Sequence, residues 1–143
     1  MRDDPIPDSD HVSRYSRAAY CTENGEVTSA AFLLRSGEEY LSVNWLEFLG
    51  LSNRSTEIEH IRGILRTKLT LARTGRIAVL NVGSVRQNVL DNTPDRRNLR
   101  LSHQPEDRDP SHSGIFDLGP DIDLVAELMA QSVIETHPAE TSL

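Results

Sequence analysis

The sequence contains one cysteine and few aromatic residues, and both scarcities restrict what the chain can form. Cys21 is the only cysteine among 143 residues, which excludes an internal disulfide and a cysteine-based zinc site. One Trp, three Tyr and three Phe leave most of a hydrophobic core to aliphatic side chains. With a hydrophobic fraction of 37%, the composition is that of an ordinary globular protein, and the length fits one domain.

Long apolar runs are also absent. No run approaches the roughly 18 residues that a membrane-spanning helix needs. The first ten residues, MRDDPIPDSD, are acidic, whereas a secretory leader is basic and then apolar. We therefore expect a cytoplasmic protein that does not bind membranes.

Lysine is almost missing, because only Lys68 among the 15 basic residues is a lysine. This bias is typical of bacterial genes of high GC content, and arginine supplies planar donors for carboxylate and phosphate groups. The net charge of −7 opposes nonspecific nucleic-acid binding, yet residues 54–100 hold 10 basic and 4 acidic side chains. Two interpretations stay open: this basic middle packs against the acidic flanks, or it presents a basic face to an anionic partner.

Two stretches have the apolar spacing of helices. The capping box Thr56-Glu57-Ile58-Glu59 and the stripe that follows it predict a helix over residues 56–72. Pro120 suits the first turn of a second helix, predicted over residues 120–133. A shorter stretch, residues 84–90, has room for one or two helical turns.

Strand patterns occur between these helices. Alternating apolar and polar residues predict a strand over 40–45, which we expect to pair with 30–34 as a hairpin. Residues 76–82 are apolar on both faces and predict a central strand. Short strands are also predicted at 99–103 and 115–116.

Together these elements predict one α+β domain over residues 11–134. We expect a mixed or mostly antiparallel sheet of four or five strands, with the two main helices packed on one face. Residues 1–10 and 135–143 have little to bury, so we expect a flexible acidic N-terminal segment and a flexible polar C-terminal tail.

The first candidate site is the segment from His11 to Tyr15. On an extended segment His11 and Tyr15 share one face, and Arg14 takes the other. A His and a Tyr on a strand, with Glu47 from another, are the residue types by which some nucleotide-sugar transferases hold a nicotinamide nucleotide. The alternative interpretation is that Tyr15 packs on the sheet while His11 and Arg14 are exposed.

The second candidate is a polar pair, Ser42 and Asn44, within an otherwise apolar run. Both lie on the strand face opposite Trp45, which we assign to the core. Such a pair either faces water or lines a pocket.

The third candidate is the pair His103 and His112, with Glu106, Asp107 and Asp109 between them. Imidazoles beside carboxylates can bind a divalent ion, or supply a general base and the group that orients it. No metal-ligand spacing is met, so we expect no metal, and a solvated loop is the alternative. If the strands that carry the two histidines are neighbours, we expect the imidazoles to converge.

The sequence lacks Walker A, G-x-G-x-x-G, G-x-S-x-G and H-E-x-x-H patterns, and we expect no cofactor. We predict a small bacterial binding or accessory module that acts through contact with another protein. Self-association is possible for such a module, and we do not expect nucleic acid as a partner.

The alternative is a small enzyme for a nucleotide or RNA phosphodiester. It would use His11, His103 or His112 as acid and base, and Arg14 and Arg100 to bind phosphate. Convergence of these side chains in one pocket would favour the enzyme.

Overall fold

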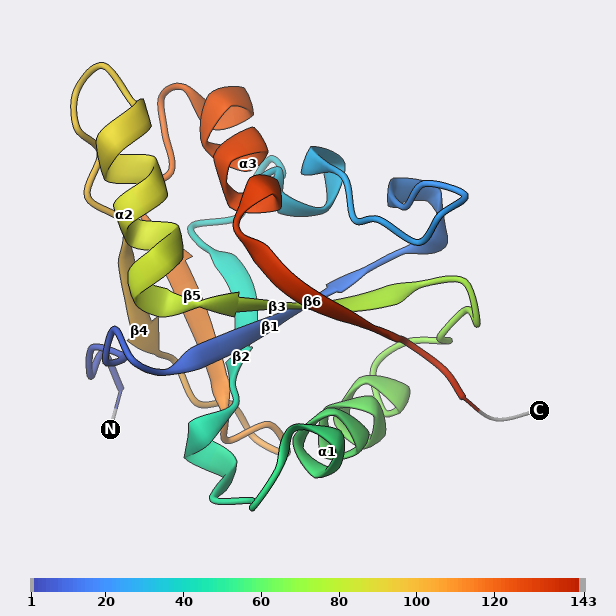
Figure 1. Cartoon of the computed structure of the whole chain (residues 1–143). Helices are drawn as coiled ribbons and strands as arrows, with labels where there is room; N and C mark the ends of the chain where they lie inside the picture. Colours follow the sequence, from blue (N-terminus) through green and yellow to red (C-terminus); the bar gives the residue numbers. More distant parts are fainter. Residues whose placement is uncertain (1, 142–143) are drawn as a thin grey trace.

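The structure, a computed structural model, describes residues 2–141. Its strands, of which the described residues form six, are β1 (His11–Ser16), β2 (Leu41–Trp45), β3 (Arg76–Asn81), β4 (Arg100–His103), β5 (His112–Phe116) and β6 (Val133–Pro138). Its α-helices are α1 (Arg54–Arg66), α2 (Val82–Asn92) and α3 (Ile122–Gln131). The strands form a single antiparallel sheet in the order β4-β5-β2-β1-β3-β6 (Figure 1). The predicted α+β class is confirmed, with six strands in place of four or five. No helix among the described residues is long and apolar enough to cross a membrane.

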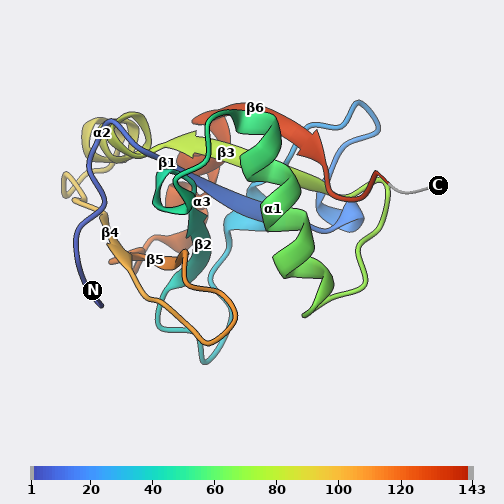
Figure 2. The ribbon, with the colours of Figure 1, turned by 90° about the horizontal axis from the view of Figure 1, so that it is seen from below.

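The helices cover both faces of the sheet, so the prediction that they pack on one face is wrong. Figure 1 shows α2 and α3 above the sheet and α1 below it, and Figure 2 shows α1 from its own side. Apolar residues of β3 alternate between the two layers: Ala78 and Leu80 pack with α2 and α3, while Ile77 and Val79 pack with α1. This is why the strand is apolar on both faces: it is buried on both sides as predicted, although it lies next to the edge strand β6 and not at the centre of the sheet.

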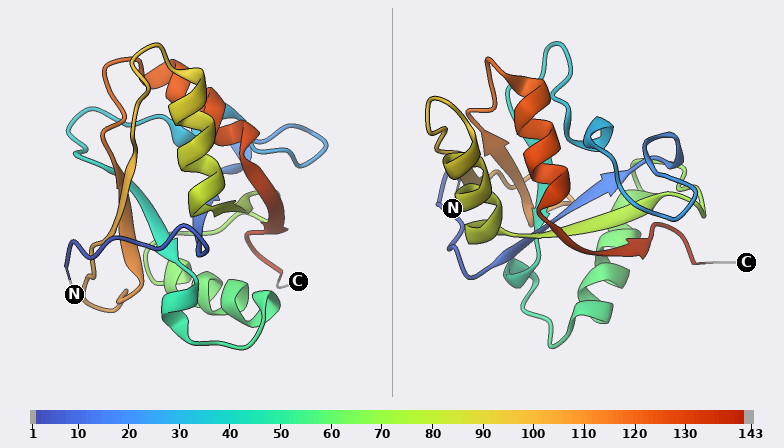
Figure 3. Two further views of the ribbon diagram at one scale, coloured as in Figure 1. Left: turned by 60° about the vertical axis from the view of Figure 1, so that its left-hand side comes forward. Right: turned by 45° about the horizontal axis from the view of Figure 1, so that its top comes forward.

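Helix α2 is a full helix where the sequence predicted at most two turns. Gly83, Ser84 and Asn88 have low helix propensity, which weakens the helical signal in the sequence. The helix nevertheless buries an apolar stripe of Val82, Val85 and Val89. The side chain of Asn81 caps the helix by accepting a hydrogen bond from the backbone N–H of Ser84 at 2.9 Å. Figure 3 shows α2 beside α3.

Helix α1 is confirmed, with different ends. Asn53, not Thr56, is the N-cap, because its side-chain oxygen accepts from the backbone N–H of Thr56 at 2.9 Å. The helix ends at Arg66, so Lys68 and Leu69 of the predicted helix lie in the connection that follows it. That connection leads Lys68 toward the sheet.

Three other expectations need correction. Residues 29–32 form a 3-10 turn and not a strand, so the predicted hairpin with β2 is absent from the described residues. Residues 3–6 run along β4, where Ile6 is buried and donates its backbone N–H to the carbonyl of Leu101 at 3.0 Å. Strand β6 occupies positions 135–138, where a polar tail was predicted. The remaining ends of the two predicted flexible segments, residue 1 and residues 142–143, lie outside the described residues.

The sheet consists of two halves that are weakly joined at its centre. Strands β1 and β3 pair over six residues, whereas β1 and β2 pair only at Val12–Trp45 and Ser13–Asn44. Beyond Ser13 the two strands separate, and Figure 1 shows β2 crossing β1 at a large angle. This separation positions the candidate site.

Candidate functional site

Arg14 fills the gap between the separated strands. If the β1–β2 register continued, Tyr15 would lie opposite Ser42 and their backbones would pair. Instead the Arg14 side chain donates from Nη1 to the carbonyl oxygen of Ser42 at 2.8 Å and from Nε to that of Ala31 at 2.9 Å. Burial lowers the pKa of Arg14 to about 10, so the guanidinium is still charged at neutral pH.

A pocket of about 460 Å³ opens on the α1 side of this gap. Its sheet floor carries side chains from three strands: Ser13 and Tyr15, Ser42 and Asn44, and His112. Its walls come from the end of α1, the loop 104–111, and the segments 17–20 and 31–38. The second candidate pair of the sequence analysis, Ser42 and Asn44, therefore lines a pocket.

One end of the pocket is rich in unpaired arginine. Arg14, Arg17 and Arg35 line it together with one carboxylate, Glu38, which accepts the backbone N–H of Arg35 at 2.7 Å. Within residues 2–141 none of the three guanidinium groups forms an ion pair, although the Glu38 charge partly offsets the effect of burial on the pKa of Arg14. Tyr20 holds two of them: the Arg35 side chain donates to its hydroxyl at 2.7 Å, and the Arg17 guanidinium lies 5.3 Å from its ring centre. Unpaired guanidinium groups facing one cavity form an anion-binding surface.

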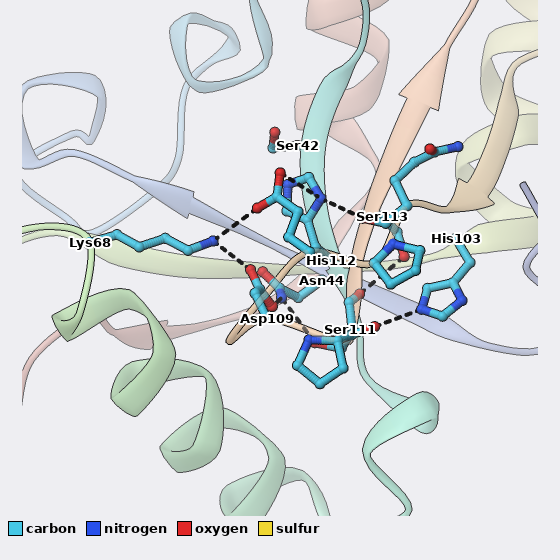
Figure 4. Close-up of polar contacts among 12 residues, drawn as sticks. Ser42, Asn44, Lys68, His103, Asp109, Ser111, His112 and Ser113 are labelled. Carbon is cyan, nitrogen blue, oxygen red and sulfur yellow. Dashed lines mark hydrogen bonds and ion pairs between the residues drawn. The ribbon is translucent and has the colours of Figure 1, made fainter. Parts of the chain in front are cut away.

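Behind the lining of the other end lies a buried carboxylate that binds two lining side chains. Asp109 is 1% exposed and accepts hydrogen bonds from the Lys68 ammonium at 2.6 Å and from the Asn44 amide at 2.7 Å. Figure 4 shows Lys68 reaching Asp109 from the helix side, with Asn44 on the strand behind. Glu106 lies 3.6 Å from the same ammonium. The carboxylates of Asp109 and Glu106 thus neutralise the Lys68 ammonium. The excess of positive charge in the pocket is at the arginine end.

His112 lies at this end of the floor and is 6% exposed. Its ring is held by Gln104, Glu106 and Tyr40. Its Nδ1 lies 2.9 Å from the carbonyl oxygen of Gln104 and 3.6 Å from the Glu106 carboxylate. A carbonyl oxygen can only accept, so Nδ1 donates this hydrogen bond, and a singly protonated ring has its lone pair on Nε2. Within residues 2–141, Nε2 has no hydrogen-bond partner.

Tyr40 packs against the edge of the His112 ring, with ring centres 6.0 Å apart. Its own ring lies across Gly114, where a Cβ atom would be 2.4 Å from Tyr40 Cδ1, so only glycine allows this approach. Burial, and then the Glu106 carboxylate, raise the pKa of the Tyr40 phenol.

The two candidate histidines do not converge, although β4 and β5 are neighbours as the sequence analysis required. His103 pairs with Ser113, and directly paired residues share a face of the sheet, so His112 lies on the opposite face. His103 stacks on Phe48 with ring centres 4.5 Å apart, and its Nε2 lies 2.6 Å from the carbonyl oxygen of Pro110. Buried at 2% exposure, it belongs to the packing of this end of the sheet.

Of the remaining candidates, only Tyr15 lines this pocket. His11 and Glu47 do meet, with 2.7 Å between Nδ1 and the carboxylate, but neither lines the pocket. Arg100 lies over the Phe116 ring at 4.0 Å, on strand β4. Tyr15 packs against the α1 cluster and also lines the pocket. No group of three or more His, Cys, Asp or Glu residues suited to a metal ion occurs within residues 2–141.

Sequence reasoning missed Arg17, Arg35, Lys68 and the role of Asp109. Arg17 and Arg35 belong to loops with no regular spacing, so nothing local marks them. Lys68 falls inside the predicted helix, and its partner is 41 residues away. One signal was available: Lys68 is the single lysine in an arginine-rich chain.

Comparisons of the chain with protein-family models, curated proteins and solved structures found no match.

Proposed function

We propose that this protein binds a small anionic ligand, of the nucleotide class, in the pocket beside Arg14. The observation that supports this most is the set of three guanidinium groups around one cavity, against the single carboxylate of Glu38 beside them, in a protein whose net charge is −7. A volume of about 460 Å³ is within the range of small-molecule sites, roughly 300–1,000 Å³.

Arg14 has a specific energetic reason to favour an anion. Its charge is carried at a cost, since burial disfavours the protonated form. The hydrogen bonds to Ala31 and Ser42 use Nε and Nη1, which leaves Nη2 without a hydrogen-bond partner among the described residues. A phosphate or carboxylate oxygen at Nη2 would offset the cost of burying this charge.

The remaining lining matches a ligand that is more than an ion. Tyr15 and Tyr20 offer aromatic surface, and the Ser42 hydroxyl offers both a donor and an acceptor. A nucleotide combines a planar ring, hydroxyl groups and phosphate, which is the chemistry that such a lining recognises.

The test is calorimetric titration of the full chain with AMP, and separately with inorganic phosphate. We expect AMP to bind, and the double variant R17Q/R35Q to weaken binding by about 10-fold or more, since each lost charge-assisted hydrogen bond is worth about 1.5–3 kcal/mol. R73Q is the matched control, because Arg73 is also exposed and without an ion pair but does not line this pocket. Equal affinity in both variants, or no heat with either probe, would contradict the proposal.

Contact with another protein stays a prediction. The large apolar side chains that the described residues expose are Phe48, Leu51, Leu69 and Ile134, and they belong to three separate segments. A docking surface is favoured by a contiguous apolar patch, so the pocket is the better supported basis for function.

A further inference from the structure

The base of the pocket contains a group that ligand binding alone does not use. His112 has its Nδ1 side engaged by Gln104 and Glu106, while its Nε2 lone pair is left without a partner among residues 2–141. The imidazole is therefore already oriented for proton transfer, and accepting a proton at Nε2 needs no further ordering of the ring. The carbonyl of Gln104 and the carboxylate of Glu106 both stabilise the imidazolium that results.

We propose that His112 is the general base of a phosphodiesterase reaction in this pocket, on a substrate of single-nucleotide size. The inference rests on the proposed binding function, because the arginine end must hold the phosphate. It extends that function from binding to catalysis, and it names the substrate class as a phosphodiester.

The step requires water and is balanced as a hydrolysis. The Nε2 of His112 takes a proton from a water molecule as its oxygen forms a bond to phosphorus. The phosphorus–oxygen bond to the leaving group breaks on the side opposite the attacking water. The leaving oxygen takes a proton from solvent, and the imidazolium returns its proton to solvent. The products are a phosphomonoester and an alcohol. Arg14, Arg17 and Arg35 stabilise the negative charge that gathers on the phosphoryl oxygens.

Two features of the pocket favour a diester over a monoester. Glu106 lies at the His112 end, 3.6 Å from Nδ1, and its carboxylate would repel the second negative charge of a monoester there. The arginines line the same cavity, and Tyr20 contacts two of them. A diester carries a single negative charge, so its phosphoryl group can be held by the arginines with the attacking water between phosphorus and Nε2 of His112.

The test uses two probes, bis(4-nitrophenyl) phosphate and 2′,3′-cyclic AMP, with the full-length chain. We expect both to be hydrolysed, and H112A to lower kcat by about 100-fold or more, the usual contribution of a general base. H60Q is the matched control, because His60 is exposed on α1 and does not line the pocket. Added imidazole should restore part of the activity of H112A, which a purely structural role of His112 would not allow.

Binding and catalysis fail in different ways. If the wild-type chain binds AMP but hydrolyses neither probe, the catalytic role of His112 is overturned and the binding function stands. If neither AMP nor phosphate binds and neither probe is hydrolysed, both proposals are overturned. Hydrolysis that H112A retains in full would assign the reaction to another group.

Discussion

The Arg14 guanidinium donates to the backbone carbonyl of Ser42 at 2.8 Å, across a gap where two neighbouring strands have stopped pairing. A side chain thus takes the place of a backbone donor at the centre of a six-stranded sheet. The gap would otherwise leave buried carbonyl groups without partners, which is unfavourable. The same side chain closes the gap and contributes to the lining of the pocket.

Replacing Arg14 should therefore reduce stability as well as binding. R14M removes the donors to Ser42 and Ala31 together, and we expect the free energy of unfolding to fall by about 2–4 kcal/mol. Urea denaturation followed by circular dichroism measures this. R73M, at an exposed position without an ion pair, should stay within about 0.5 kcal/mol of the wild type. A similar small effect for R14M would show that the gap is satisfied by other groups.

Gly114 offers a test of the support beneath His112. In G114A the new methyl group would overlap the body of the Tyr40 ring, with atoms as close as 2.4 Å, so Tyr40 has to leave its position. We expect a loss of about 1–3 kcal/mol in unfolding free energy, measured by thermal and urea denaturation.

The control for this prediction is Gly63, which lies in the middle of α1, where an added methyl group would meet nothing within 4 Å outside the helix's own backbone. G63A should stabilise the protein by about 0.5–1 kcal/mol, since alanine is the better helix former. If G114A were as stable as the wild type, the close packing of Tyr40 on β5 would be wrong.

Tyr40 should ionise at a higher pH than an ordinary tyrosine, because burial and the nearby Glu106 raise the pKa of its phenol. In an ultraviolet titration of the folded protein, we expect Y40F to remove the phase that ionises at the highest pH. The raised pKa of Tyr40 also makes the free energy of unfolding depend on pH. The contribution of Tyr40 is complete below the unfolded pKa of about 10 and is lost as the pH rises through the folded value.

E106Q tests the cause of that shift. Removing the Glu106 charge should move the late phase to lower pH without abolishing it, because burial is the larger cause. A titration curve whose late phase is unchanged in Y40F would contradict the raised pKa of Tyr40.

The parts of the fold that the sequence predicted are those encoded locally. The alternation in residues 40–45 and the two-sided apolarity of 76–82 each depend on neighbours within one strand, and both strands are present. The convergence of His103 and His112 depended on register, which local spacing does not specify. A pairing of His103 with Ser113 was enough to place the two imidazoles on opposite faces.

The candidate site was predicted in part, for the same reason. Arg14, Ser42, Asn44 and His112 come from strands, whose alternation indicates which side chains share a face. Arg17, Arg35 and Lys68 come from loops, and their place at the pocket depends on how the whole chain closes around the sheet. Helix α1 was wrongly predicted to share a face of the sheet with α3. An apolar stripe shows that a helix packs against the sheet, but it does not show which face of the sheet the helix covers.

The segment 3–6 that runs along β4 has a consequence for self-association. Its backbone hydrogen bonds with Leu101 and His103 cover one edge of the sheet, so within residues 2–141 the free edge is that of β6. Strand addition from molecule to molecule needs two free edges in order to continue. Of the two edge strands, β6 is therefore the one whose outer side can accept a strand from a second copy.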